Sequence, residues 1–221
     1  MVIDIPFFTQ EVIPALNQGL KVSIALIIPA SILGFVGGVA LGCLRAFGGP
    51  WCSRLGNWYT AIIRGVPLLV QLFYIYYALG RIIQVPPMVS AVIAISFCYG
   101  AYMGEVFRAG ILAIPHGQTE AARSLGFNRV QTMFYVVLPQ AWRTIIPPVG
   151  NECIAMLKDT ALVSVIGMPD LMQRARSFAS KSYCYFESYT VVALVYLIIT
   201  LILSKIVSII EARLNHYDRK K

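Results

Sequence analysis

The chain has 221 residues, of which 58% are hydrophobic and 13% are charged, and its mean hydropathy is +0.72. Soluble domains contain roughly 45 to 50% apolar residues, so this composition excludes an ordinary soluble domain and indicates an integral membrane protein. The formal net charge of +8 comes from basic residues spread over short loops and the tail, without a nucleic-acid-binding motif, and we interpret it as topogenic charge that also attracts anionic membrane lipid.

Five stretches of the chain are candidates for membrane spans, each close to the about 20 apolar residues that a transmembrane helix needs. The predicted spans are residues 20–44, 57–79, 86–108, 147–167 and 188–210. The fourth is the least clean, because it contains Glu152, Lys158 and Asp159. The runs are continuous and show no sustained period of two, which argues against a β-barrel. We therefore predict an all-α integral membrane protein, a single domain over residues 1–221 with about five transmembrane helices.

The distribution of Lys and Arg predicts the orientation of the spans. No basic region precedes the first apolar run, so we expect the first span to stay in the membrane and not to be removed as a signal peptide. One side carries ten basic residues: Arg45, Arg54, Arg108, Arg123, Arg129, Arg143, Arg213, Arg219, Lys220 and Lys221. The other side carries four, Arg81, Arg174, Arg176 and Lys181, or five with Lys21. The positive-inside rule then places the N-terminus outside and the C-terminus in the cytoplasm.

A polar loop of more than 25 residues, about 111–141, lies on the predicted cytoplasmic side, whereas helix connections usually have about 2 to 8 residues. Gln118 to Leu125 favours a helix, Gly126 can adopt the left-handed conformation that ends one, and Asn128 is a favourable N-cap for a second short helix, Arg129 to Leu138. Ala121 and Ala122 would leave a flat face for a partner, beside the polar Glu120, Arg123 and Arg129. The loop is thus either a docking surface or a solvated connector.

Motifs for catalysis or nucleotide binding are not found in the sequence. The five cysteines form no C-x-x-C pair, and the two histidines have no metal-ligand spacing around them. No hydrolase signature and no G-x-x-x-x-G-K-[ST] loop occurs, so any ATP-driven step would need a partner. We predict that the chain is not an enzyme and carries no cofactor.

Charged residues within predicted spans mark a second candidate site. Seven positions separate Glu152 from Asp159, which is nearly two helical turns, so both carboxylates would lie on one helix face. Ionisable groups at the bilayer centre cost about 2.5 to 3.5 kcal/mol, and facing a water-filled cavity or a bound cation would avoid most of that cost. The alternatives are interhelical ion pairs, with Arg64 as a candidate partner, or charges near the bilayer surface.

Two further segments have open interpretations. Gly65 and Pro67 would kink the second span and expose backbone groups to a substrate, or they serve packing. Residues 168–188 are too polar to span, and we interpret them as a solvated outer loop that could touch an external partner protein.

The loop also carries a pattern that resembles a known motif. Its fixed positions are Glu120, Ala121, Ala122, Gly126, Val136, Leu138 and Pro139. This spacing resembles the EAA motif of permease subunits of binding-protein-dependent ABC importers. "RGVPLLVQLFYIYYALG", residues 64–80, and "GNECIAMLKDTALVSVIG", residues 150–167, resemble signatures of the polar amino acid permeases of the histidine, arginine, glutamine and cystine type. Ala161 departs from the serine that is common there.

The resemblance implies a type I ABC importer permease fold in the bacterial cytoplasmic (inner) membrane. It implies coupling to a dimer of ATP-binding subunits through Glu120, Ala121, Ala122, Gly126, Leu138 and Pro139. It further implies a second permease subunit, identical or related, an extracytoplasmic amino-acid-binding protein, and ATP with Mg bound on the partner ATPase alone. The substrate pathway would include Arg64, Glu152 and Asp159, and two acidic groups would favour a basic amino acid.

Two other classes of membrane protein remain as alternatives. A scaffold or channel subunit could use the same loop to bind a cytoplasmic partner without transport. A secondary transporter is a further alternative, although 221 residues leave little room for the inverted repeats of those folds.

Overall fold

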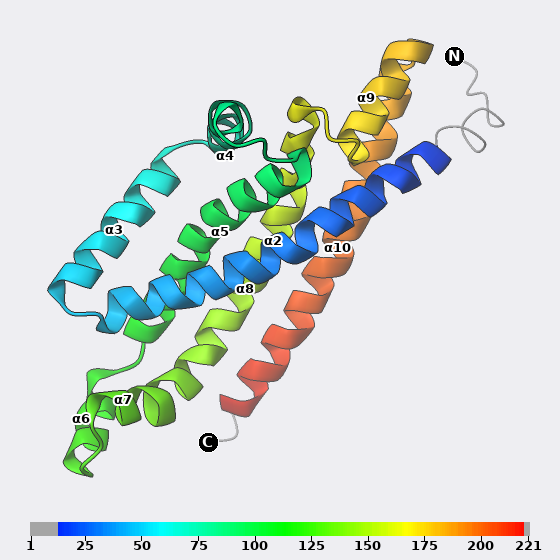
Figure 1. Cartoon of the computed structure of the whole chain (residues 1–221). Helices are drawn as coiled ribbons and strands as arrows, with labels where there is room; N and C mark the ends of the chain where they lie inside the picture. The colour runs from blue at the N-terminus through cyan, green and yellow to red at the C-terminus, as the bar shows by residue number, and fades with distance from the viewer. Residues whose placement is uncertain (1–12, 219–221) are drawn as a thin grey trace. The chain divides into compact units, whose positions relative to one another are not determined.

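The computed structural model describes residues 13–218 (Figure 1). The N-terminal residues 1–12 and the basic residues Arg219, Lys220 and Lys221, to which the sequence assigns opposite sides of the membrane, lie outside this range. The described part is built of helices, without a strand between residues 13 and 218, which confirms the all-α prediction. Three of its helices are long and apolar enough to cross a membrane: Leu16–Phe47, Pro87–Leu112 and Tyr185–Leu214.

The α-helices follow one another in chain order. They are α2 (Ile13–Phe47), α3 (Pro50–Gly65), α4 (Leu68–Phe73), α5 (Pro87–Leu112), α6 (His116–Ser124), α7 (Arg129–Thr132), α8 (Leu138–Asp159), α9 (Leu171–Ser182) and α10 (Tyr185–Asp218). Two π-helical turns, Tyr74–Ala78 and Met133–Val137, and two 3₁₀ segments, Leu79–Arg81 and Thr160–Ile166, continue them.

The described residues divide into two compact units. The first contains residues 13–32, 66–96 and 154–203, and the second contains residues 33–65, 97–153 and 204–218. The division cuts through α2, α5, α8 and α10, so each of these helices contributes one part to each unit.

The core of the second unit joins α5 to α8 and the π-helical turn before it. Its buried members are Phe107, Ile111, Met133, Val137, Ala141 and Ile145. Gly110 allows the close approach of the two helices, because a Cβ there would clash with Cγ1 of Ile145. Any larger residue would push the helices apart and open this core.

The core of the first unit joins α2, α9 and α10 through Leu16, Leu171, Ala175 and Val192. Residues 168–188 are therefore not the solvated loop that their polarity suggested. Asp170 caps α9 by accepting hydrogen bonds from the backbone N–H groups of the next turn, which allows a helix to begin there. The apolar residues of that helix recur on one face and pack, while Arg176 and Lys181 are exposed.

The second predicted span, 57–79, is wrong as a single helix. α3 ends at Gly65 and α4 begins at Leu68, and Pro67 has a non-helical ψ of 140°. Proline has no N–H to continue the helical ladder, and it forces the residue before it out of the α-helical region. The kink that Gly65 and Pro67 predicted is thus confirmed as a complete break.

The fourth predicted span, 147–167, has different boundaries in the structure. α8 begins nine residues earlier, at Leu138, and ends at Asp159, after which the chain continues as a 3₁₀ segment to Ile166. Gly167 closes this segment in the left-handed region, with φ 77°. By length and composition, α8 is not among the described helices that qualify as spans, because its polar and charged residues lower the hydropathy.

Candidate functional site

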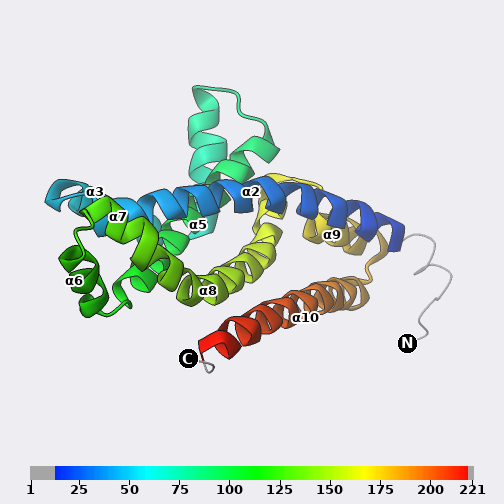
Figure 2. The ribbon, with the colours of Figure 1, turned by 90° about the horizontal axis from the view of Figure 1, so that it is seen from below.

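The polar loop forms a short helix, α6, with one outward and one inward side. Glu120 and Ala121 are exposed, whereas Ala122 is 4% exposed and faces the protein. Gln140 on α8 donates a hydrogen bond of 3.4 Å to the side chain of Gln118, which links α6 to α8. Figures 1 and 2 show α6 and α7 side by side in both views. The loop therefore presents an ordered, exposed helix face.

Gly126 ends α6 in the left-handed region, with φ 86°, as the sequence predicted. The Phe127 N–H donates to the Ala122 carbonyl at 3.1 Å, and the Gly126 N–H donates to the Arg123 carbonyl at 3.0 Å. This pair of hydrogen bonds is a Schellman motif, which satisfies carbonyl groups left over at the end of a helix. A side chain at Gly126 would have open space but a strained backbone.

Asn128 caps the next helix, which also confirms the prediction. Its side-chain oxygen accepts from the Gln131 N–H at 2.9 Å, and the Gln131 side chain accepts from the Asn128 N–H at 2.9 Å. Such a reciprocal capping box fixes the start of a helix. The helix direction after the turn is thus set by local hydrogen bonds.

The predicted second helix, Arg129 to Leu138, is wrong as a separate element. α7 continues through the π-helical turn Met133–Val137 directly into α8. Pro139 explains the π-helical turn. Proline cannot donate the hydrogen bond that an α-helix makes to the carbonyl four residues upstream, and a π-turn accommodates this defect. Pro139 is exposed, whereas Leu138 packs against the core of the second unit.

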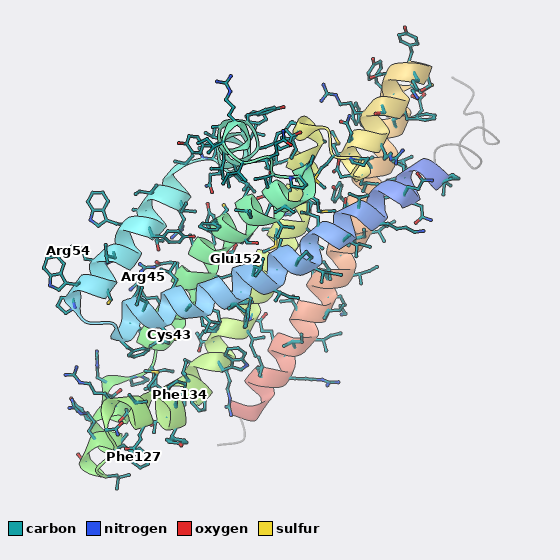
Figure 3. All side chains as sticks on the ribbon, in the orientation of Figure 1. Cys43, Arg45, Arg54, Phe127, Phe134 and Glu152 are labelled. Atoms are coloured by element: carbon teal, nitrogen blue, oxygen red, sulfur yellow. The ribbon has the colours of Figure 1, made fainter. Side chains whose placement is uncertain are left out.

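The second unit also contains Arg64 and Glu152 of the predicted substrate pathway. The Arg64 guanidinium lies 5.0 Å from the ring centroid of Tyr102, in a cation–π contact. The Arg64 charge acts on the half-buried Glu152 carboxylate, but among the described ion pairs these two do not form a contact pair. Asp159, at the end of α8, belongs to the first unit and is half-buried there. Arg64 on α3 thus acts electrostatically on Glu152 on α8, the residue that Figure 3 labels.

Tyr102 was missed at the sequence level. In the sequence, Tyr102 stands out only as an aromatic residue within the predicted span 86–108, and such a position more often serves packing. Its contact with Arg64 adds an aromatic face to the two charges.

Sequence analysis also missed a charged cluster that joins three helices of the second unit. Arg45 donates to Glu105 at 2.6 Å and to Asn57 at 2.8 Å, and Arg108 donates to the other Glu105 oxygen at 2.5 Å. The Arg45 side chain is 7% exposed. Gly56 makes room for it, because a Cβ there would lie 2.5 Å from Cγ of Arg45. The i,i+3 spacing of Glu105 and Arg108 was the one available signal, and it does not reveal Arg45.

Residues 13–218 contain no group of three or more His, Cys, Asp and Glu side chains that could hold a metal ion.

The described residues combine apolar helices long enough to cross a membrane with an ordered polar loop. Residues 34–216 match the family described as "Binding-protein-dependent transport system inner membrane component". The chain belongs to this family, and it is therefore the inner-membrane permease component of a bacterial ABC importer.

The relatives confirm the predicted resemblance to polar amino acid permeases. The glutamine transport system permease protein GlnP of Escherichia coli (strain K12) is 37% identical over 210 residues, covering 92% of this chain and 94% of the relative. The L-cystine transport system permease protein TcyB of Bacillus subtilis (strain 168) is 38% identical over 217 residues, covering 96% and 91%.

Solved structures show the same fold. A crystal structure described as an amino acid ABC transporter with histidines has a TM-score of 0.89 at 38% identity, covering 96% of this chain and 100% of that chain. The inward-facing MetNI methionine ABC transporter has a TM-score of 0.74 at 20% identity, covering 92% and 96%, and shows the fold alone. The type I permease fold is thereby confirmed.

Proposed function

We propose that this permease imports a polar amino acid, which a separate binding protein delivers from outside, and that it is driven by separate ATPase subunits. The observation that carries the proposal is the shape of the α6 loop, in which Glu120 and Ala121 are exposed on a short helix whose end is closed by a Schellman motif. The names of the relatives, which include glutamine, arginine and cystine permeases, support the substrate class.

The coupling role falls to α6 and the turn after it. A helix whose end and following turn are fixed by hydrogen bonds can pass on a displacement, whereas a flexible connector would absorb it. Glu120, Ala121, Gly126 and Pro139 are exposed and available to a partner, while Ala122 and Leu138 anchor the loop to the protein. ATP and Mg would be held by a dimer of ATP-binding subunits, beside a second permease subunit that is the same or related.

The substrate path would use the charges of the second unit. A zwitterionic amino acid carries a carboxylate and an ammonium group, and Arg64 and Glu152 supply one charge of each opposite sign. Tyr102 lies against the Arg64 guanidinium and would restrict its orientation. Asp159, in the first unit, is the other acidic residue that we assign to the substrate pathway, and a second acidic group would favour a basic amino acid.

The substitution Glu152→Gln tests the substrate role. It keeps the shape of the side chain and removes its charge, so uptake should fall at least about tenfold, the effect of losing one charge-assisted hydrogen bond. The assembled transporter should retain its normal subunit ratio and ATP hydrolysis stimulated by the binding protein. Glu211→Gln, which removes an exposed charge on α10, is the matched control and should transport normally.

Uptake of labelled glutamine, arginine, histidine and cystine by the same cells, each in competition with the others, would identify the amino acid. Unchanged uptake in Glu152→Gln would exclude a substrate role for this residue. Stimulated ATP hydrolysis without uptake of any amino acid by the unmodified transporter would contradict the importer itself.

A further inference from the structure

A largely apolar groove of about 820 Å³ lies in the second unit, where α2 and α5 end. One wall is formed by the end of α2, including Cys43 and Phe47, and another by α6 and the π-helical turn with Phe134. Figure 3 labels Cys43 and Phe134, which come from these two walls. The groove therefore separates the α6 loop from the ends of two membrane-crossing helices.

The groove opens through exposed apolar side chains. Leu112 is 59% exposed, Phe134 62% and Val130 64%, and all three line the groove together with the buried Met133 and Val137. A continuous apolar surface of this kind is unfavourable in water and marks a site that an apolar group covers.

The charged side chains of the lining are cationic. Arg123 and Arg129 are exposed and line the groove, as does His116, and its described lining contains no Asp or Glu. Arginine forms strong charge-assisted hydrogen bonds with phosphate oxygens. The groove thus combines an apolar surface with a cationic rim, which is complementary to a molecule that has acyl chains and an anionic head.

The position of the groove suits such a molecule. Phe47 and Leu112 are the last residues of two candidate membrane spans, so the groove lies at the ends of these spans, where lipid headgroups are expected. The basic residues of the loop assign this level to the cytoplasmic leaflet, which carries the anionic lipids.

We propose that this groove binds one anionic phospholipid, whose phosphate contacts Arg123 and Arg129 and whose acyl chain covers Phe134, Met133 and Val137. The lipid fills the space between α6 and the ends of α2 and α5, and so holds the loop in position. This goes beyond the proposed transport function and depends on neither the amino acid nor the ATPase.

Native mass spectrometry of the assembled transporter tests the proposal. Phosphatidylglycerol and phosphatidylcholine with identical acyl chains are titrated separately. The unmodified transporter should retain phosphatidylglycerol in preference to phosphatidylcholine. The double substitution Arg123→Gln/Arg129→Gln should weaken the binding of phosphatidylglycerol about 30-fold, the loss expected for two cations near a membrane surface. Arg54→Gln, which removes an exposed arginine outside the groove, should leave it unchanged.

Equal retention of the two lipids, or an unchanged affinity in the double variant, would overturn the proposal. Inorganic phosphate at equal concentration should not displace the lipid, and displacement would identify a simple phosphate site instead.

A second measurement keeps both arginines and so does not depend on the folding of the double variant. A photo-reactive benzoylphenylalanine replaces Phe134 in the transporter in native membranes, and the cross-linked product is identified by its mass. A phospholipid adduct is expected. A cross-link to the ATPase or to the second permease subunit would show that a protein covers the groove and would refute the proposal. None of these measurements uses transport, so they can fail while the proposed importer function stands.

Discussion

The cluster of Arg45, Glu105 and Arg108 predicts a large loss of stability when Glu105 loses its charge. Glu105 is the shared acceptor of both arginines, and the Arg45 side chain is 7% exposed, so Glu105→Gln leaves a nearly buried guanidinium without its counter-ion, hydrogen-bonded to Asn57. Breaking a buried ion pair by removing one partner costs about 3 to 5 kcal/mol. Because the Glu105 side chain is 28% exposed and glutamine keeps one acceptor oxygen, we expect the free energy of unfolding to fall by about 2 to 3 kcal/mol.

The assay is thermal unfolding of the purified transporter, followed with a thiol-reactive dye that labels the buried Cys98 once the protein opens. At about 2 to 4 °C per kcal/mol for a chain of this size, Tm should fall by about 4 to 12 °C. Arg108→Gln is the matched control, since the Arg108 side chain is 32% exposed and Glu105 keeps Arg45, and it should lower Tm by less.

A double-mutant cycle isolates the interaction between Arg45 and Glu105. The double substitution Arg45→Gln/Glu105→Gln strands no charge between these two positions, so it should cost less than the sum of the single substitutions. Simple additivity, or a Glu105→Gln variant as stable as the unmodified protein, would refute the role assigned to the cluster.

Two further predictions concern the loops. Gly126→Val should lower uptake and the amount of ATPase that co-purifies, because a β-branched residue is strained at φ 86°. Gly126→Asn should retain most of both, since asparagine tolerates the left-handed region. Equal activity of the two variants would contradict this role of Gly126. Burial raises the pKa of the Asp170 carboxyl from 3.8 to about 6, so the folded state binds this proton more tightly and stability should fall as the pH rises from about 4 to about 6. Asp170→Asn should remove that dependence and raise Tm at pH 7.5, because it removes the cost of burying a charged carboxylate, about 2 to 3 kcal/mol. A pH profile of Tm that is unchanged in this variant would assign the dependence to another group.

Much of the local structure could be predicted from the sequence, because it depends on neighbouring residues. The apolar runs that match α2, α5 and α10 are long enough to be recognised by composition. The left-handed Gly126 and the capping Asn128 follow from the conformational freedom of glycine and the short acceptor side chain of asparagine. The motif spacing in this loop also indicated the family that the comparisons show.

Only the tertiary structure decided which distant residues meet. Arg45 and Glu105 are 60 positions apart, and Ser23 on α2 accepts a hydrogen bond from the N–H of Leu171, 148 positions away. Residues 168–188 looked like a solvated loop because the segment is polar. Its alanines are buried only because α2 and α10 pack against them, and the sequence does not show these partners. Caps, breaks and spans arise within a few residues of the chain, whereas ion pairs, packed faces and grooves need partners that the fold brings together, and no local pattern records those partners.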